Sequence, residues 1–369
     1  MIVAHAPGKL FVAGEFAVVE PGQPAVLVAV DRYVTVRLTA SGDDGSVDSP
    51  GRAARPVTWR VTDGGVCAAD PERAFGHVLA AIGVVEQLRA ERGLPVRHAR
   101  LLIESGLDDA SGRKYGLGSS AAVTVATVRA LGELHALGLS PEQVYRLALL
   151  ATIRVSPAAS GGDVAASTFG GWLRYAAPDR AALLARLDGD PGRGLRRETL
   201  TDLLAAPWPG LELTPLPGPR TLRLLVGWTG TPASTDAQVA RARATAVDRG
   251  AFLAASRSAV DRLTAGLLAG DDDACRAALG TARAALATHA AATGVVIETD
   301  LLRSLCDVAQ AQGAAAKSSG AGGGDCGLAL APAGADIAAI EAGWREHGID
   351  PLALGVAPRT DDPAREATR

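Results

Sequence analysis

The chain has 369 residues and carries 37 Lys and Arg against 40 Asp and Glu, so its formal net charge is −3. Its hydrophobic fraction of 48% and charged fraction of 21% are typical of a water-soluble globular protein, and its length predicts two domains. The basic residues form no stripe and aromatic residues make up only 4%, which argues against a nucleic-acid-binding surface.

The sequence also lacks the patterns of export and of membrane insertion. The N-terminus has no basic stretch followed by an apolar run, and no stretch of about 18 apolar residues occurs in the chain. The four cysteines are widely spaced and form no Cys-x-x-Cys pair. We therefore expect free thiols, no zinc site and a reducing cytoplasmic location.

Short β-rich runs separated by turn residues dominate the first hundred residues. Six of these runs predict strands, at residues 2–5, 9–13, 25–30, 33–38, 56–62 and 97–104. Glu20-Pro21-Gly22-Gln23 predicts a type II turn, because proline fixes φ at the second position and glycine accepts a positive φ at the third. Residues 41–55 predict a loop, and residues 75–92 have the apolar spacing of a helix.

The middle of the chain predicts helices and then a change of domain. A glycine-rich turn precedes a helix that begins at Ser119 and ends before Gly138. The sequence Ser140-Pro141-Glu142-Gln143 indicates the start of another helix, with serine at the N-cap and glutamine positioned for a capping box. Residues 178–220 are rich in Pro, Gly and Arg, so we expect the first domain to give way to the second within them.

The second half predicts a strand at 221–228 followed mainly by helices. The predicted helices lie at residues 234–248, 252–268, 272–288, 295–312 and 337–346. A second glycine-rich loop at 317–324 precedes an apolar run at 326–330, and a last strand is predicted at 352–357. The chain is thus predicted to be an α+β protein with domains at 1–200 and 220–358 and a flexible tail at 359–369.

The stretch Lys114 to Val123, which reads Lys-Tyr-Gly-Leu-Gly-Ser-Ser-Ala-Ala-Val, indicates a phosphate-binding loop. Gly116 and Gly118 let the backbone approach an anion, and the serines that follow are suited to cap the next helix. The first N–H groups of that helix carry the positive end of its dipole, which favours a di- or triphosphate. The spacing matches neither Gly-x-Gly-x-x-Gly nor a Walker loop. Taken alone, a structural turn that starts a helix explains the stretch equally well.

Two further motifs accompany this loop. One places Lys9 after Ala6-Pro7-Gly8, at the start of a predicted strand, and the other is Lys317-Ser318-Ser319-Gly320-Ala321-Gly322-Gly323-Gly324-Asp325. In this order, and over nearly the whole chain, the three motifs resemble the signature motifs of the GHMP kinases. The resemblance implies a two-domain α+β fold, with a ribosomal-protein-S5-like N-terminal domain and a ferredoxin-like C-terminal domain.

Within that superfamily the chain is most similar to the phosphomevalonate kinase family. The similarity rests on four stretches: residues 9–36, Lys114-Tyr115, residues 160–166 and residues 227–230. Mevalonate kinases usually carry a histidine where this chain has Phe16. The resemblance implies that ATP, with Mg²⁺, phosphorylates 5-phosphomevalonate to 5-diphosphomevalonate on the mevalonate route to isopentenyl diphosphate. It also implies a monomer or homodimer whose partners are small molecules rather than nucleic acid or a membrane.

The resemblance further implies roles for individual residues. Lys9 and Asp163 would be catalytic: Lys9 would offset the repulsion between two phosphates, and Asp163 would orient the acceptor or take its residual proton. The ATP-binding residues would be Lys114, Gly116, Leu117, Gly118, Ser119, Ser120 and Ala121, with Ser120 also reaching Mg²⁺. The residues near the substrate phosphate would be Lys9, Ser319, Gly320, Ala321 and Gly322. Outside this context, Asp163 reads as a helix cap and Lys9 as a surface lysine.

The chain departs from the superfamily pattern at the metal. Several GHMP kinases carry a metal-binding glutamate shortly before the catalytic aspartate, whereas residues 150–154 contain no carboxylate. Mg²⁺ is then expected to be held mainly by ATP phosphates, Ser120 and water. Arg154 has two interpretations, a phosphate ligand or a solvated residue at a helix end. Mevalonate kinase or another small-molecule GHMP kinase, and a non-catalytic metabolite sensor, are the alternative functions.

Overall fold

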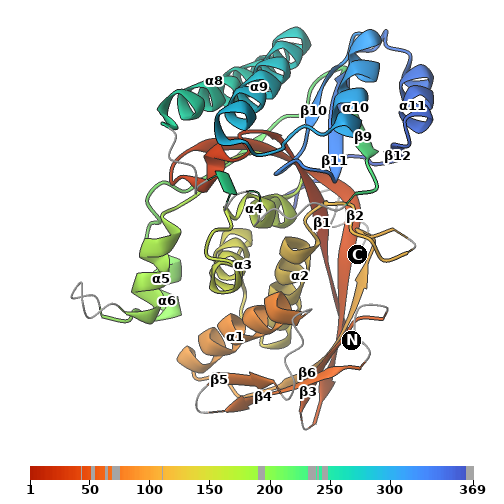
Figure 1. Cartoon of the computed structure of the whole chain (residues 1–369). Coiled ribbons are helices and arrows are strands. Elements are labelled where there is room, and N and C mark those ends of the chain that lie inside the picture. The colour runs from red at the N-terminus through yellow and green to blue at the C-terminus, as the bar shows by residue number, and fades with distance from the viewer. Residues whose placement is uncertain are drawn as a thin grey trace.

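The computed structural model describes residues 1–42, 44–50, 55–62, 65–68, 75–109, 111–189, 196–231, 238, 241–242 and 248–362. These residues form two β-sheets, each covered by helices, which confirms the predicted α+β class (Figure 1). The predicted helix at 234–248 lies almost entirely outside the described residues. None of the described helices is long and apolar enough to cross a membrane.

The first sheet has eight strands among the described residues, in the order β5-β4-β3-β6-β2-β7-β8, with β1 paired to β2. The strand bounds are β1 Ile2–Ala13, β2 Pro24–Ser41, β3 Gly45–Asp48, β4 Val57–Thr62, β5 Gly65–Ala68, β6 His98–Ser105, β7 Trp172–Ala176 and β8 Glu212–Leu216. Its pairings are antiparallel except for β3 with β6. Because β8 pairs with β7, this sheet extends beyond residue 200 of the chain.

The hairpin of β1 and β2 is longer than the sequence predicted. The runs at 2–5 and 9–13 form one strand, and so do those at 25–30 and 33–38. The β1–β2 register shifts between Pro7 and Gly8, where proline has no N–H group for the ladder. The predicted turn between the strands is confirmed: the Gln23 N–H donates to the Glu20 carbonyl at 3.1 Å, and Gly22 has a φ of +73°.

Four helices cover one face of the first sheet: α1 Gly76–Glu91, α2 Ser119–Leu134, α3 Pro141–Val155 and α4 Gly162–Phe169 (Figure 1). Their apolar residues join those of β1, β2 and β6 in one large core. The predicted capping box of α3 is confirmed, since Ser140 accepts from the Gln143 N–H at 3.2 Å and Gln143 bonds back to Ser140. Two shorter helices, α5 Arg180–Asp188 and α6 Leu200–Ala205, follow before β8.

The second sheet has the order β10-β11-β9-β12 and is antiparallel throughout. Its strands are β9 Arg223–Trp228, β10 Ala315–Ser318, β11 Cys326–Ala331 and β12 Asp350–Leu352, and its helices are α8 Gly250–Ala269, α9 Asp272–Thr293, α10 Asp300–Ala311 and α11 Ile337–Glu346. Helices α8 and α9 lie over the turn end of the β1–β2 hairpin, so the second half of the chain packs on the first sheet there (Figure 1).

Three predictions for these elements were wrong in whole or in part. The loop predicted at 41–55 contains β3, which pairs with both β4 and β6. The helix predicted from residue 295 begins only at Asp300, because Thr299 is its N-cap and accepts from the Leu302 N–H. The last strand lies at 350–352, and of the predicted stretch 352–357 only Leu352 belongs to it, while Val356 forms an isolated antiparallel bridge with Val30. The Thr360 N–H donates to the Phe169 carbonyl of α4 at 2.8 Å, and residues 363–369 lie outside the described part, so the flexible tail stays a prediction.

A buried charge cluster joins the ends of α1 and α2. The Glu86 carboxylate lies 2.6 Å from the Arg89 guanidinium and 2.7 Å from the His135 ring, and all three side chains are buried. Burial alone raises the pKa of Glu86, but hydrogen bonds from His135 and Arg89 and their charges outweigh it, so the pKa is lowered from 4.5. The cluster therefore stabilises the fold above the ordinary glutamate pKa.

We expect Glu86→Gln to lower the free energy of unfolding by about 3 kcal/mol at pH 7, because it removes the buried counter-charge of Arg89. The lowered pKa means that this contribution is lost as the pH falls through the folded-state pKa of Glu86, so the variant and the wild type should converge in stability below that pKa. Urea unfolding at several pH values measures this difference in the free energy of unfolding. Glu133→Gln, an exposed glutamate of α2, is the control. A pH-independent difference would contradict the assignment.

Candidate active site

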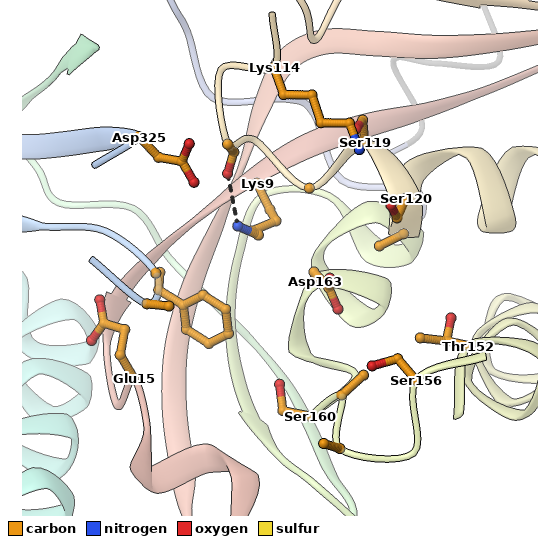
Figure 2. Close-up of a pocket in the computed structure, with 18 of the residues that line it drawn as sticks. Lys9, Glu15, Lys114, Ser119, Ser120, Thr152, Ser156, Ser160, Asp163 and Asp325 are labelled. Atoms are coloured by element: carbon orange, nitrogen blue, oxygen red, sulfur yellow. Dashed lines mark hydrogen bonds between the residues drawn. The ribbon is translucent and has the colours of Figure 1, made fainter. Parts of the chain in front are cut away.

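A cavity of about 580 Å³ lies where the end of β1, the starts of α2 and α4, and the loop between β10 and β11 come together (Figure 2). The three motifs singled out in the sequence all contribute to its wall. The predicted site residues that line it are Lys9, Lys114, Gly116, Gly118, Ser119, Ser120, Ala121, Asp163, Gly320 and Ala321. The fold thus brings together most of the residues that the motif resemblance implied.

Lys9 lies in β1 and is only 7% exposed, so its reading as a surface lysine is wrong. Its Nζ donates to the Gly116 carbonyl at 3.3 Å and lies 5.5 Å from the centre of the Phe11 ring. The main chain is held as well, because the Lys9 N–H donates to the Leu117 carbonyl at 2.9 Å. This bond is the role that the structure gives to Leu117, whose side chain is buried away from the cavity.

The first glycine loop needs its glycines for both conformation and space. Gly116 and Gly118 have φ values of +81° and +80°. A Cβ on Gly118 would lie 3.0 Å from Cε of Lys9 and 3.7 Å from Cβ of Asp163, and one on Gly116 would lie 2.4 Å from the Asp325 carboxyl carbon. The loop therefore passes directly between the side chains that line the cavity.

The N-terminus of α2 differs from the prediction in one respect. Its N-cap is Gly118 rather than a serine, and no side chain caps it. Ser119 is buried and Ser120 half-buried, and both border the cavity at the first turn of the helix. Because no side chain accepts from these first N–H groups, they remain suited to bind an anion. Lys114, at the outer end of the loop, is exposed.

Asp163 lies in the first turn of α4, across the cavity from Lys9 and below the glycine loop (Figure 2). The helix-cap reading is wrong, because the N-cap is Gly161 and carries no side-chain cap. The Asp163 carboxylate accepts from the neighbouring Val164 N–H at 2.9 Å. It is half-buried and belongs to the cavity wall.

Two buried tyrosines, which no sequence motif pointed to, support the backbone before α4. The Tyr175 hydroxyl donates to the Ser160 carbonyl at 2.6 Å and lies 3.0 Å from the Tyr145 hydroxyl. Burial, with a smaller effect of the Asp163 charge, raises the pKa of Tyr175. Both phenols therefore stay neutral and hold the loop that presents Asp163.

The second glycine loop contributes fewer cavity residues than expected. Gly320 and Ala321 line the cavity, but the Ser319 hydroxyl is bound to β1, where it accepts from the Phe11 N–H at 2.9 Å and donates to the Phe11 carbonyl at 3.0 Å. Gly322 packs on the Ile297 carbonyl, where a Cβ would lie only 2.2 Å away. Ser319 and Gly322 thus hold the loop to β1 and to Ile297, and their contact with the substrate phosphate stays a prediction.

A buried ion pair that the sequence analysis missed joins two of the motifs. The Lys317 ammonium contacts the Glu15 carboxylate, and both side chains are almost fully buried. Glu15 also borders the cavity, so the pair fixes the second glycine loop against the end of β1. Lys317 begins the second glycine loop and Glu15 lies in the stretch 9–36. Only the fold shows that they meet, because 302 positions separate them.

The cations around the cavity come from β1 and from the loop before α2. Among the described residues that line it, Lys9, Arg113 and Lys114 carry a positive charge. Arg154 is not part of this wall and instead contacts Asp188 at 3.4 Å, which favours its reading as a residue of the helix end. Thr152, in the stretch without a carboxylate, borders the cavity and donates to the Ala148 carbonyl at 2.8 Å.

Comparisons with known proteins agree with this geometry. Residues 78–171 match the GHMP kinases N terminal domain, and residues 267–350 match the GHMP kinases C terminal domain. The chain is 44% identical to a phosphomevalonate kinase of Streptomyces sp. (strain CL190), over 96% of each chain.

Two solved structures are similar to the whole fold. The Lin0012 protein from Listeria innocua aligns with a TM-score of 0.87 and 32% identity, covering 98% of this chain and 99% of that one. Streptococcus pneumoniae phosphomevalonate kinase in complex with phosphomevalonate and AMPPNP aligns with a TM-score of 0.82 and 27% identity, covering 96% of this chain and 100% of that one.

Proposed function

The chain belongs to the GHMP kinases, in their phosphomevalonate kinase branch, and we propose that it transfers the γ-phosphoryl group of ATP to the phosphate of 5-phosphomevalonate. The products are 5-diphosphomevalonate and ADP. One observation carries the proposal: Lys9 and Asp163 converge on Gly118, at a helix N-terminus that no side chain caps. The phosphomevalonate and AMPPNP bound by the Streptococcus pneumoniae enzyme support the choice of both substrates.

The first glycine loop and the first turn of α2 would bind the ATP phosphates. Gly116 and Gly118 adopt the positive φ that the turn into α2 needs, and Ser119, Ser120 and Ala121 border the cavity at the positive end of the helix dipole. Phosphoryl transfer requires little covalent work from the protein, so positioning and charge neutralisation are what this loop supplies.

Lys9 would neutralise the charge that develops between donor and acceptor. Both are phosphates, so bringing them together is opposed by their mutual repulsion. The Lys9 ammonium is buried and fixed by the Gly116 carbonyl, which places a cation in a region of low water access. A fixed charge in such a site stabilises the transition state more than a mobile surface lysine would.

Asp163 would act on the acceptor. A phosphate monoester has its second pKa near about 6, so at neutral pH its oxygens are largely ionised and a strong base is not needed. Asp163 would therefore orient the acceptor phosphate and take its residual proton. Gly320 and Ala321, on the opposite wall, would complete the acceptor side with Lys9.

The donors around the cavity fit Mg²⁺ bound together with ATP. The described residues contain no group of three or more His, Cys, Asp or Glu that would form an all-protein metal site. The Ser120 hydroxyl borders the cavity, and Mg²⁺ commonly takes only one or two protein oxygens beside phosphates and water. When bound, the ion would neutralise phosphate charge.

We also propose a reducing cytoplasmic location, since all four cysteines are free and three are buried.

The acceptor assignment predicts a clear preference among substrates. In a coupled assay of ADP release, 5-phosphomevalonate should be turned over at least about 100-fold more efficiently than mevalonate, because a site built for a phosphate leaves its cation unpaired with the smaller acceptor. The same assay is run with homoserine and with galactose as further candidate acceptors. Turnover of mevalonate but not of 5-phosphomevalonate would refute the assignment, and ligand binding without turnover would indicate a sensor.

A further inference from the structure

Two stretches that marked the sequence similarity meet in the fold without a role in the proposed chemistry. Tyr115 directly precedes Gly116 of the ATP loop, and Trp228 is the last residue of β9 in the second sheet. Their rings make an edge-to-face contact, with centroids 4.9 Å apart and planes at 78°. Trp228 is only 2% exposed, so the contact is buried.

Arginines extend this contact on both sides. The Arg32 guanidinium lies over the Tyr115 ring at 4.9 Å, and the Arg113 guanidinium lies over the Trp228 ring at 4.8 Å. Arg113 also donates to the Gly230 carbonyl at 3.4 Å. The result is a row of cation, ring, ring and cation that passes from β2 through the ATP loop to the second sheet.

The backbone at the start of the ATP loop is held by the same sheet. The Cys326 thiol, at the start of β11, donates to the Tyr115 carbonyl at 3.0 Å. The Asp325 carboxyl group packs against Gly116, where there is no space for a Cβ. Toward the first sheet, the Tyr115 N–H donates to the Leu107 carbonyl at 3.2 Å. Residues 115 and 116 are thus held from both sides, and the second sheet and the loop before β11 supply the contacts from Trp228, Cys326 and Asp325.

These contacts reach the proposed chemistry through Gly116. Its carbonyl accepts from Lys9, and two residues later Gly118 packs on the Lys9 stem and starts α2. We propose that Tyr115 and Trp228 are positioning residues through which the second sheet fixes the ATP loop for nucleotide binding. This inference rests on the proposed function, because it assumes that the loop binds ATP.

The test measures the binding of MgADP and of 5-phosphomevalonate separately, by titration calorimetry on the full chain. We expect Tyr115→Leu and Trp228→Leu each to weaken MgADP binding about tenfold, the effect of losing a well-packed ring contact. The double variant should be little weaker than either single one, because both remove the same contact. Tyr115→Phe keeps the ring and should bind MgADP within about twofold of the wild type. The affinity for 5-phosphomevalonate should not change.

Trp208→Leu is the matched control. Trp208 is also buried, also lies beneath an arginine (Arg146, at 4.9 Å) and donates to the Leu203 carbonyl, but it borders neither the ATP loop nor the cavity. It should lower the urea midpoint and leave MgADP binding intact. Three results would overturn the inference. Trp208→Leu could weaken MgADP binding as much as Tyr115→Leu does, or Tyr115→Leu could bind MgADP as the wild type does. Tyr115→Leu and Trp228→Leu could also weaken the binding of MgADP and of 5-phosphomevalonate equally.

A different result would refute the proposed function. A wild-type chain that binds MgADP but releases no ADP with 5-phosphomevalonate refutes the reaction, while its variants still report whether the ring contact fixes the loop. A wild type that turns over normally, with Tyr115→Leu at wild-type MgADP affinity, refutes only the positioning role.

Discussion

Asp163→Asn is expected to lower kcat by at least about 100-fold while MgADP affinity stays unchanged, because the substitution removes a charge that acts on the acceptor and not on the nucleotide. Asparagine is nearly isosteric with aspartate, so the backbone at the start of α4 should be preserved. The Tyr175 hydroxyl, which holds this backbone through Ser160, is untouched. Steady-state ADP release and calorimetry with MgADP measure the two effects separately.

A control for the loss of one carboxylate is Asp336→Asn. Asp336 caps α11 by accepting from the Ala339 N–H, and asparagine is an equally good capping residue. This variant should keep full activity. If Asp163→Asn is itself as active as the wild type, Asp163 has no part in catalysis and only its place in the cavity wall remains.

Lys9→Ala is expected to lower kcat by at least about 100-fold, since the transition state loses the buried cation between two phosphates. MgADP should still bind, because the loop and the first turn of α2 remain. Lys9→Met separates charge from packing: it retains most of the stem that packs on Gly118 and should lose as much activity as Lys9→Ala. Lys9→Arg should not restore activity, because the larger guanidinium does not fit beside Gly116 and Gly118.

Urea unfolding distinguishes a catalytic loss from a structural one for Lys9. Both Lys9→Ala and Lys9→Met remove the hydrogen bond to Gly116, but only alanine also leaves a cavity beneath the loop. Lys9→Met should therefore unfold at a urea midpoint closer to that of the wild type. A Lys9→Met variant that turns over 5-phosphomevalonate at the wild-type rate would show that the charge is dispensable.

Local chemistry explains which parts of the fold were predictable. The turn at Glu20–Gln23 and the capping box at Ser140 depend on neighbours within a few residues, so their signals are complete in the sequence. Strand β3 was missed because Gly45–Asp48 is short and polar, and becomes a strand only by pairing with β4 and β6. The predicted start of α10 at residue 295 was too early. Val295 and Ile297 are apolar for another reason, because they pack beside Phe252 and Leu286.

The candidate site likewise has features that were predictable from the sequence and features that only the fold reveals. The sequence by itself determined which motifs are present, that Gly116 and Gly118 free the backbone for an anion, and that a lysine and an aspartate accompany them. Only the tertiary structure decided that Lys9 is buried against Gly116, that Ser319 binds β1, and that Tyr115 meets Trp228. The physical reason is distance along the chain: conformational preferences act between neighbours, whereas burial, ion pairing and ring contacts depend on which distant segments the two sheets bring together.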